Sequence, residues 1–186
     1  MKRIGVILIA VVLLCGCTGK SDELDRVMGL RAKLLGCMEV RFNAAITADY
    51  GDEIHTFAMS CTGDNQGNLH FTVTQPETIA GIAGRIGEDA GTLTFDDVAL
   101  EFPLMADEQV TPVSGPWILL RTLLGGYLTA CGTEDDNLRV SIDDSYEDDA
   151  LNLEIWLDGE DRPIQAEILY DGRRIVTMEI ENFEIV

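Results

Sequence analysis

Apolar and polar residues follow two different periods along this chain. Leu24, Val27, Met28, Leu34 and Leu35 recur at the spacing of one helix face, and Gly36 then supplies a stop signal. This pattern predicts a helix over residues 22–35. Beyond Gly36 the period shortens to two, which is the period of a strand with one buried face. The chain therefore begins its folded part with a helix and continues mainly as strands.

About nine strands are predicted from this alternation, because each apolar run is bounded by turn residues. Strands joined by short turns are antiparallel. A change of apolar phase between Ile180 and Phe183 predicts a bulge near Asn182. The predicted strands cover residues 40–48, 53–61, 69–73, 93–95, 98–102, 138–142, 151–157, 164–170 and 176–185.

Two more helices are predicted inside the run of strands, each beginning at a proline. The first covers residues 76–84 and places Ile79 and Ile82 on one face. The second covers residues 116–128, which form the most apolar stretch after the N-terminus. That stretch is too short to span a bilayer, which needs about 20 residues. Residues 103–114 are expected to form an irregular loop, and the whole predicts one α+β domain.

The N-terminus has the layout of a secretory leader. Lys2 and Arg3 precede an unbroken apolar stretch over residues 4–14. Leu14-Cys15-Gly16-Cys17 then resembles the lipobox of bacterial lipoproteins, with Leu14 at position −3 and a small residue at −1. Cys15 does not fit as the modified residue, because Leu14 would then stand where a small residue is required.

The lipobox resemblance implies lipid on the Cys17 sulfur and cleavage between Gly16 and Cys17. We therefore expect a signal peptide over residues 1–16, a lipidated tether over 17–21, and one domain over 22–186. Two or more acyl chains, such as palmitate, give stable membrane attachment. The expected location is the extracytoplasmic side of the cell membrane.

The net charge and the absence of catalytic motifs exclude several classes of function. The formal net charge is −20, so the surface repels nucleic acid. No nucleophile, metalloprotease or phosphate-cradling motif is present, so we expect no enzyme activity and no cofactor. His55 and His70 are the only histidines, and a metal site with a cysteine is the less favoured interpretation of them. The acidic run over residues 143–149 is expected to be a solvated turn, because it lacks the glycine and glutamate spacing of an EF-hand.

Three cysteines remain besides Cys15 and Cys17. Outside the cytoplasm a disulfide is plausible, and no Cys-x-x-Cys is present to suggest redox catalysis. We expect Cys37 and Cys61 to pair as neighbours on one hairpin, with a Cys61–Cys131 pair as the alternative.

The order of predicted elements resembles the half-barrel of LolA and LolB, the outer-membrane lipoprotein carrier and receptor. Two pieces carry this resemblance most clearly. The first is the strand that runs through Val73–Glu77 into a proline-started, glycine-containing helix with Ile79-Ala80-Gly81-Ile82. The second is the long strand before Arg162-Pro163, followed by the Asp171-Gly172 hairpin. The resemblance implies a strongly curved antiparallel sheet, with helices covering its concave face.

An incompletely filled space between helices and sheet would accept an acyl chain or another apolar ligand. Its expected lining comes from the two proline-started helices: Ile79, Ile82, Trp117, Leu120 and Leu124. Two alternatives stay open. These residues complete a dry core, as apolar stripes usually do, or the domain is a scaffold for an envelope protein and holds no small ligand.

Overall fold

The fold is built on one large antiparallel sheet, as the alternation predicts. The computed structural model describes residues 19–87, 90–95, 98–102, 105–106, 109–147 and 150–186. The sheet has 11 strands in the order β6-β5-β4-β3-β2-β1-β13-β12-β11-β10-β9, and β7 pairs with β8 separately. The strands are β1 Val40–Asp49, β2 Ile54–Gly63, β3 Leu69–Gln75, β4 Ala83–Ile86, β5 Gly91–Phe95, β6 Val98–Phe102, β7 Met105–Ala106, β8 Gln109–Val110, β9 Tyr127–Glu134, β10 Asn137–Asp143, β11 Asn152–Leu157, β12 Pro163–Tyr170 and β13 Arg173–Ile185.

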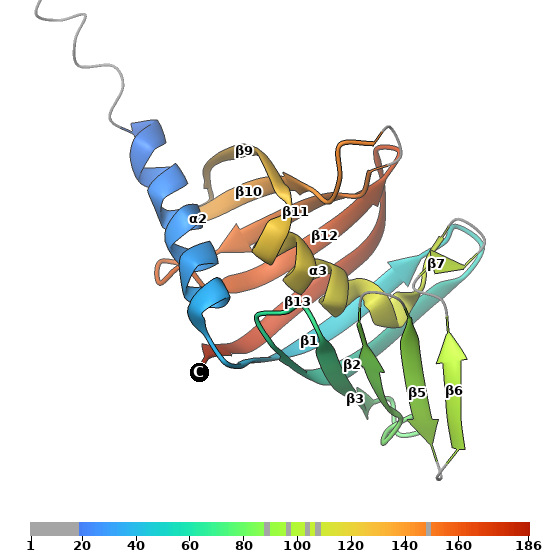
Figure 1. Cartoon of the computed structure of the whole chain (residues 1–186). Helices are drawn as coiled ribbons and strands as arrows, with labels where there is room; N and C mark the ends of the chain where they lie inside the picture. Colours follow the sequence, from blue (N-terminus) through green and yellow to red (C-terminus); the bar gives the residue numbers. More distant parts are fainter. Residues whose placement is uncertain (1–18, 88–89, 96–97, 103–104, 107–108, 148–149) are drawn as a thin grey trace, which may run out of the picture.

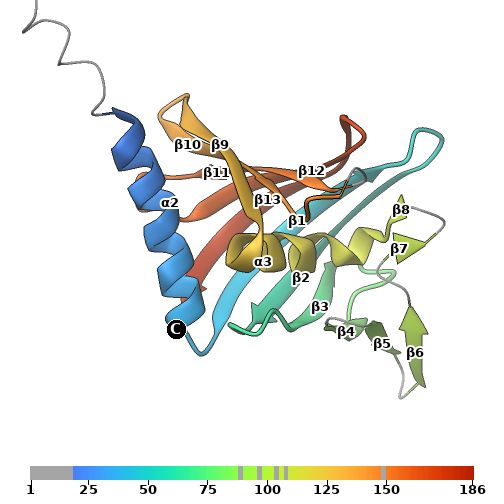
Figure 2. The same ribbon diagram turned by 45° about the horizontal axis from the view of Figure 1, so that its top comes forward.

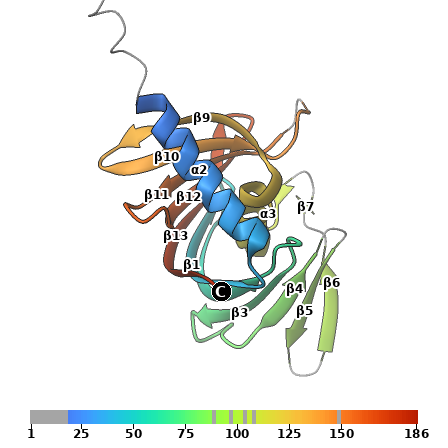
Figure 3. The ribbon, with the colours of Figure 1, turned by 60° about the vertical axis from the view of Figure 1, so that its left-hand side comes forward.

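Two α-helices lie on the same face of this sheet (Figures 1 and 3). They are α2 (Gly19–Gly36) and α3 (Gly115–Gly125), and a 3-10 turn, η1 (Pro112–Ser114), leads into α3. Within the described ranges, no helix combines the length and the apolar character needed to cross a bilayer. The open antiparallel sheet with helices on one face is thus confirmed.

The core lies between this sheet face and the helices. In β1, every second residue from Val40 to Ala48 is buried and the intervening residues are exposed. α2 contributes Val27, Leu30 and Leu34, whereas α3 is buried almost all round. A helix that is apolar on all sides needs cover on all sides, and α3 gets it from the sheet beneath and α2 beside it.

Arg31 joins the two helices. Its guanidinium donates hydrogen bonds to the carbonyl oxygens of Leu123 (2.8 Å) and Gly126 (2.9 Å), at the C-terminal end of α3. The last carbonyls of a helix have no partner within the helix and carry partial negative charge. A cation from α2 therefore satisfies them and fixes the crossing of the two helices.

The helix predicted over residues 76–84 is wrong. Residues 77–81 form successive turns, and β4 begins at Ala83. The N–H groups of Val73 and Gly81 bond to the carbonyls of Ile82 (2.8 Å) and Val73 (2.9 Å), which closes a loop at the end of β3. Gly81 has φ +91°, a conformation outside a right-handed helix. Strand pairing at both ends of the segment thus overrides its local helical signals, and two α-helices cover the sheet instead of three.

Two further boundaries differ from prediction. The expected irregular loop over residues 103–114 contains β7, β8 and η1. The last predicted helix ends at Gly125, because the chain turns extended at Gly126 and continues as β9, which pairs with β10. A side chain at Gly126 would lie 2.6 Å from Ile142, so the chain approaches the sheet closely at this point.

The predicted bulge near Asn182 is confirmed. Arg41 pairs with Glu184 and Asn43 with Glu181, so one residue of β1 faces two of β13. Asn182 has φ +54°, which asparagine tolerates better than most residues. The bulge moves Phe183 into the buried face.

Candidate functional site

The sheet face is left partly uncovered where β4, β5 and β6 extend past the end of α3 (Figure 2). On these strands Leu93 pairs with Leu100 and Phe95 with Val98, so their side chains share the face that is the core elsewhere. Exposure of this face rises toward the edge, with 50% at Phe95, 59% at Val98 and 63% at Leu100. A contiguous exposed apolar surface of this kind marks a binding site more often than a scattered one does.

Two glycines let aromatic rings lie flat on this end of the sheet. The ring of Phe71 covers Gly84, where an added side-chain carbon would lie 2.5 Å from the ring. The ring of Phe102 covers Gly91 in the same way, at 2.1 Å. At each of these two positions a ring from the neighbouring strand lies over the glycine, so no side chain projects from the sheet there. The apolar face is therefore flatter at this end of the sheet.

An apolar pocket of about 410 Å³ opens where this face meets η1. Its floor comes from β2, β3 and β5, one wall from the loop between β3 and β4, and the opposite wall from η1. Among the described residues that line it, His55 and Thr56 carry the polar side chains. The apolar lining residues are Ile54, Phe57, Val73, Pro76, Ile79, Ile82, Leu93, Pro112 and Val113.

Tyr50 holds the η1 wall in place. Its hydroxyl donates a hydrogen bond to the carbonyl of Val110, two residues before Pro112. Burial raises the pKa of Tyr50 to about 12, so the hydroxyl stays protonated and keeps donating at physiological pH. The segment that walls the pocket is therefore tied to the tip of the β1–β2 hairpin.

The structure divides the five predicted ligand-binding residues into two groups. Ile79 and Ile82 both line the apolar pocket, although they lie on a loop and not on a helix. Trp117 and Leu120 are 5% and 1% exposed and belong to the core, and half-buried Leu124 packs against that core.

Trp117 has a structural role. Its indole Nε1 donates a 2.8 Å hydrogen bond to the carbonyl of Gly67 in the turn between β2 and β3. The Arg121 guanidinium lies 5.1 Å from the centre of its ring. Trp117 therefore ties α3 to the sheet.

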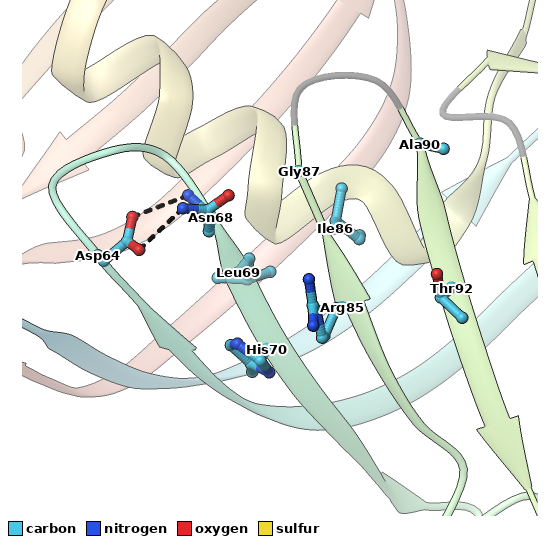
Figure 4. Close-up of a pocket in the computed structure, with 9 residues that line it drawn as sticks. All are labelled: Asp64, Asn68, Leu69, His70, Arg85, Ile86, Gly87, Ala90 and Thr92. Atoms are coloured by element: carbon cyan, nitrogen blue, oxygen red, sulfur yellow. Dashed lines mark hydrogen bonds between the residues drawn. The ribbon is translucent and has the colours of Figure 1, made fainter. Parts of the chain in front are cut away.

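A second pocket, of about 640 Å³, is polar and lies at the ends of β3, β4 and β5 (Figure 4). His70, Arg85 and Thr92 form a row across these strands, because each pairs with the next. Burial by itself raises the pKa of Asp64 at the rim, but hydrogen bonds from the Asn68 side chain and from the N–H groups of Asn68 and Gln66 lower it overall. Asp64 thus holds the turn as an ionised carboxylate, and the pocket combines polar groups with a smaller apolar part from Leu69, Ile86 and Ala90.

The candidate metal and disulfide residues are not brought together. His55 pairs with Ala48 near the start of β2, and His70 pairs with Thr62 near its other end. No group of three metal-ligating side chains occurs among the described residues. Cys17 lies outside the described part of the chain.

The predicted Cys37–Cys61 disulfide is not formed. Both thiols are buried and free. Cys37 lies in the connection between α2 and β1, not on a hairpin strand, and its Sγ lies 3.1 Å from the carbonyl oxygen of Leu34. Burial raises the pKa of the Cys61 thiol, and Cys131 is half-buried on β9.

Known proteins match this chain in structure and not in sequence. No family model matches the sequence, and no curated protein matches it. A LolA superfamily protein from Nitrosomonas europaea is 11% identical, with a TM-score of 0.44 over 86% of this chain and 93% of that one.

Two lipoprotein structures are similar to the same extent. The lipoprotein LppX from Mycobacterium tuberculosis is 12% identical, with a TM-score of 0.40 over 87% of this chain and 93% of that one. A structure of the CwlD amidase from Clostridioides difficile in complex with the GerS lipoprotein matches at 12% identity and a TM-score of 0.44, over 86% of this chain and 93% of that one. Both matches cover more than four fifths of each chain.

Proposed function

We propose that this protein binds an apolar ligand, such as a lipid acyl chain, in the pocket between β2, the β3–β4 loop, β5 and η1. The observation that carries the proposal is an almost wholly apolar lining that stays open to solvent at Ile79, which is 37% exposed. The volume of about 410 Å³ falls within the range of roughly 300 to 1,000 Å³ that is usual for small-molecule sites.

The surroundings of the pocket favour an extended ligand. Leu93 lines the pocket and pairs with exposed Leu100, so apolar surface continues from the pocket to the edge of the sheet. A chain lying along this path would bury its own apolar surface and that of the protein together, at about 25 cal/mol per Å². If the sheet curves around the bound ligand, more of the apolar surface of the ligand is buried.

Binding of a fluorescent fatty acid, dansylundecanoic acid, tests the proposal. We expect dansyl fluorescence to rise with wild-type protein and the affinity to fall by about tenfold in Ile79→Asp, because a carboxylate at the mouth must lose water when a chain enters. Met38→Asp is the matched control, since Met38 is 84% exposed and is not among the lining residues.

Native mass spectrometry of protein purified from its own host is the second measurement. A bound lipid that is retained by Met38→Asp and lost from Ile79→Asp supports the proposal. Equal probe binding by the two variants would place the ligand elsewhere. An absence of both lipid and fluorescence change would leave the pocket without this function.

We also propose that the domain is anchored by lipid on Cys17, with residues 1–16 removed as a signal peptide. The described chain begins in α2 at Gly19, so the anchor would adjoin the first turn of this helix. Labelling of host cells with an alkyne analogue of palmitate should mark the protein. Cys17→Ser should abolish the label and Cys15→Ser should leave it, whereas the reverse result would assign the anchor to Cys15.

The second candidate function is a scaffold for an envelope protein. It is favoured by the exposed apolar row Phe95, Val98 and Leu100, none of which is among the described residues that line the pocket. In-cell cross-linking from position 100 would test it, and cross-links to lipid alone would exclude it.

A further inference from the structure

We propose that the open edge of β6 binds an extended, basic segment of a partner protein as an additional strand. β6 forms one end of the 11-stranded sheet, and within the described residues it pairs only with β5. In an antiparallel strand, alternate residues direct their N–H and C=O groups toward the two sides. Half of the backbone groups of β6 are thus available to a further strand.

The two faces of β6 specify different side chains in the incoming strand. Val98, Leu100 and Phe102 lie on the face that is the core elsewhere in the sheet. Glu101 lies on the opposite face, where it is exposed and has no ion pair among the described residues. An added strand must alternate in register with β6, so its apolar residues would adjoin Leu100 and its basic residues would adjoin Glu101.

Charge selects the class of partner. The chain carries a net charge of −20, and the β5–β6 connection contributes Asp96 and Asp97 in the sequence. A second copy of the chain would bring the same negative charge to this edge, and an anionic membrane would repel it. A protein segment that alternates Lys or Arg with aliphatic residues complements both the charge and the apolar row.

This interaction surface is distinct from the proposed ligand pocket. Val98, Leu100 and Glu101 are not among the residues that line the pocket, and Ile79 and Ile82 are not on the sheet edge. Glu101→Lys, on the face opposite to the apolar surface, should therefore keep fatty-acid binding, and Ile79→Asp should keep strand binding. Each proposal can fail while the other stands.

The test uses the full chain and a labelled peptide of alternating Lys and Val, as long as β6. An isomer with the same residues in two blocks, all Lys followed by all Val, controls for charge and composition. We expect the alternating peptide to bind about tenfold more tightly than the block isomer, because only alternation supplies one apolar and one basic face. Hydrogen exchange of the amides in 98–102 should slow when it binds.

Variants of the chain separate strand addition from general attraction between opposite charges. Glu101→Lys should weaken binding of the alternating peptide by about tenfold, and Leu100→Lys should do the same. Glu181→Lys makes the same change of net charge as Glu101→Lys, but at an exposed position of β13, and it should have little effect on peptide binding. Circular dichroism confirms that each variant is folded.

Three results would overturn the proposal. They are equal affinity for the two peptides, equal loss with Glu181→Lys and Glu101→Lys, and unchanged hydrogen exchange in residues 98–102. Dimer formation through Leu100 would assign this edge to a second copy of the chain. Binding to phosphatidylcholine vesicles that is lost in Leu100→Lys would assign it to a membrane.

Discussion

The packing of α3 against β2 makes a sharp prediction at Gly63 and Leu120. A side-chain carbon added at Gly63 would lie 2.3 Å from Cδ2 of Leu120, whereas carbon atoms in contact normally stay about 3.5 to 4.0 Å apart. Leu120 is 1% exposed, so its side chain has no open space to enter. Gly63→Ala therefore forces α3 and the sheet apart, and we expect it to destabilise the fold by about 1 to 3 kcal/mol.

The companion variant removes the obstacle. Leu120→Ala should cost about 2 to 5 kcal/mol, because it deletes buried carbon and leaves a cavity. In the double variant the nearest atoms to the new methyl group, once the Leu120 side chain is shortened, are Val40 Cγ1 at 3.3 Å and the Asn68 carbonyl oxygen at 3.4 Å, and the methyl group fills part of the cavity. The double variant should thus be more stable than the sum of the single costs predicts, by about 1 to 3 kcal/mol.

Urea unfolding followed by far-ultraviolet circular dichroism measures each free energy, provided that the slopes agree among variants. Gly29→Ala on α2 is the control, since nothing lies within 4 Å of the added carbon. It should stabilise the fold by about 0.5 to 1 kcal/mol and add to Leu120→Ala without coupling. Additivity of Gly63→Ala and Leu120→Ala would refute the packing argument. A loss of fatty-acid affinity at unchanged stability would refute the core assignment of Leu120.

Three further predictions concern single groups. Tyr50→Phe should cost about 1 kcal/mol, because it leaves the Val110 carbonyl without its donor. The folded pKa of Tyr50 is raised to about 12 from 10.0, so its contribution is complete below pH 10 and declines as the pH rises toward 12. Ultraviolet titration of the tyrosines should show one late transition, which Tyr50→Phe removes; an unchanged titration curve would contradict the assignment. Cys61 should resist iodoacetamide in the folded chain, because burial raises its pKa, and it should react once urea unfolds the protein. A Cys37–Cys61 cross-link seen by non-reducing mass spectrometry would overturn the free-thiol assignment. Asp64→Ala should cost on the order of 1 kcal/mol through the lost turn hydrogen bonds. The pKa of Asp64 is lowered on folding, so this contribution is present above its unfolded pKa and is lost as the pH falls through the folded value; an equal cost at neutral and strongly acidic pH would contradict it.

The periodicity of the sequence determined the first helix and most of the strands. A strand with one buried face must alternate, and in β1 and β11 every second residue is buried while the others are exposed or half-buried. Even the bulge at Asn182 was visible, because an extra residue reverses the apolar phase of everything after it. These are local properties, because each depends on residues that are neighbours in the sequence.

The local sequence predicted the wrong element where strand pairing uses the same backbone N–H and C=O groups. Proline at position 76 and the spacing of Ile79 and Ile82 indicate a helix, but pairing of Val73 with Ile82 and of β4 with β3 uses those backbone groups. Ile79 and Ile82 nevertheless line an apolar pocket, because a loop can present two side chains to the same space. Residues 127 and 128 were included in the preceding predicted helix, and residues 129–134 were given no strand, because only pairing with β10 makes residues 127–134 a strand.

Whether an apolar face is buried or available for binding was decided by the tertiary structure alone. Trp117 and Leu100 both belong to apolar patterns in the sequence, yet one is 5% exposed and the other 63%. The difference arises because α3 does not extend over β5 and β6. The sequence of β6 does not indicate whether a helix covers its apolar face. Burial depends on elements far apart in the chain. The sequence by itself therefore determined which residues form the apolar face, and only the packing of the helices decided where that face stays open.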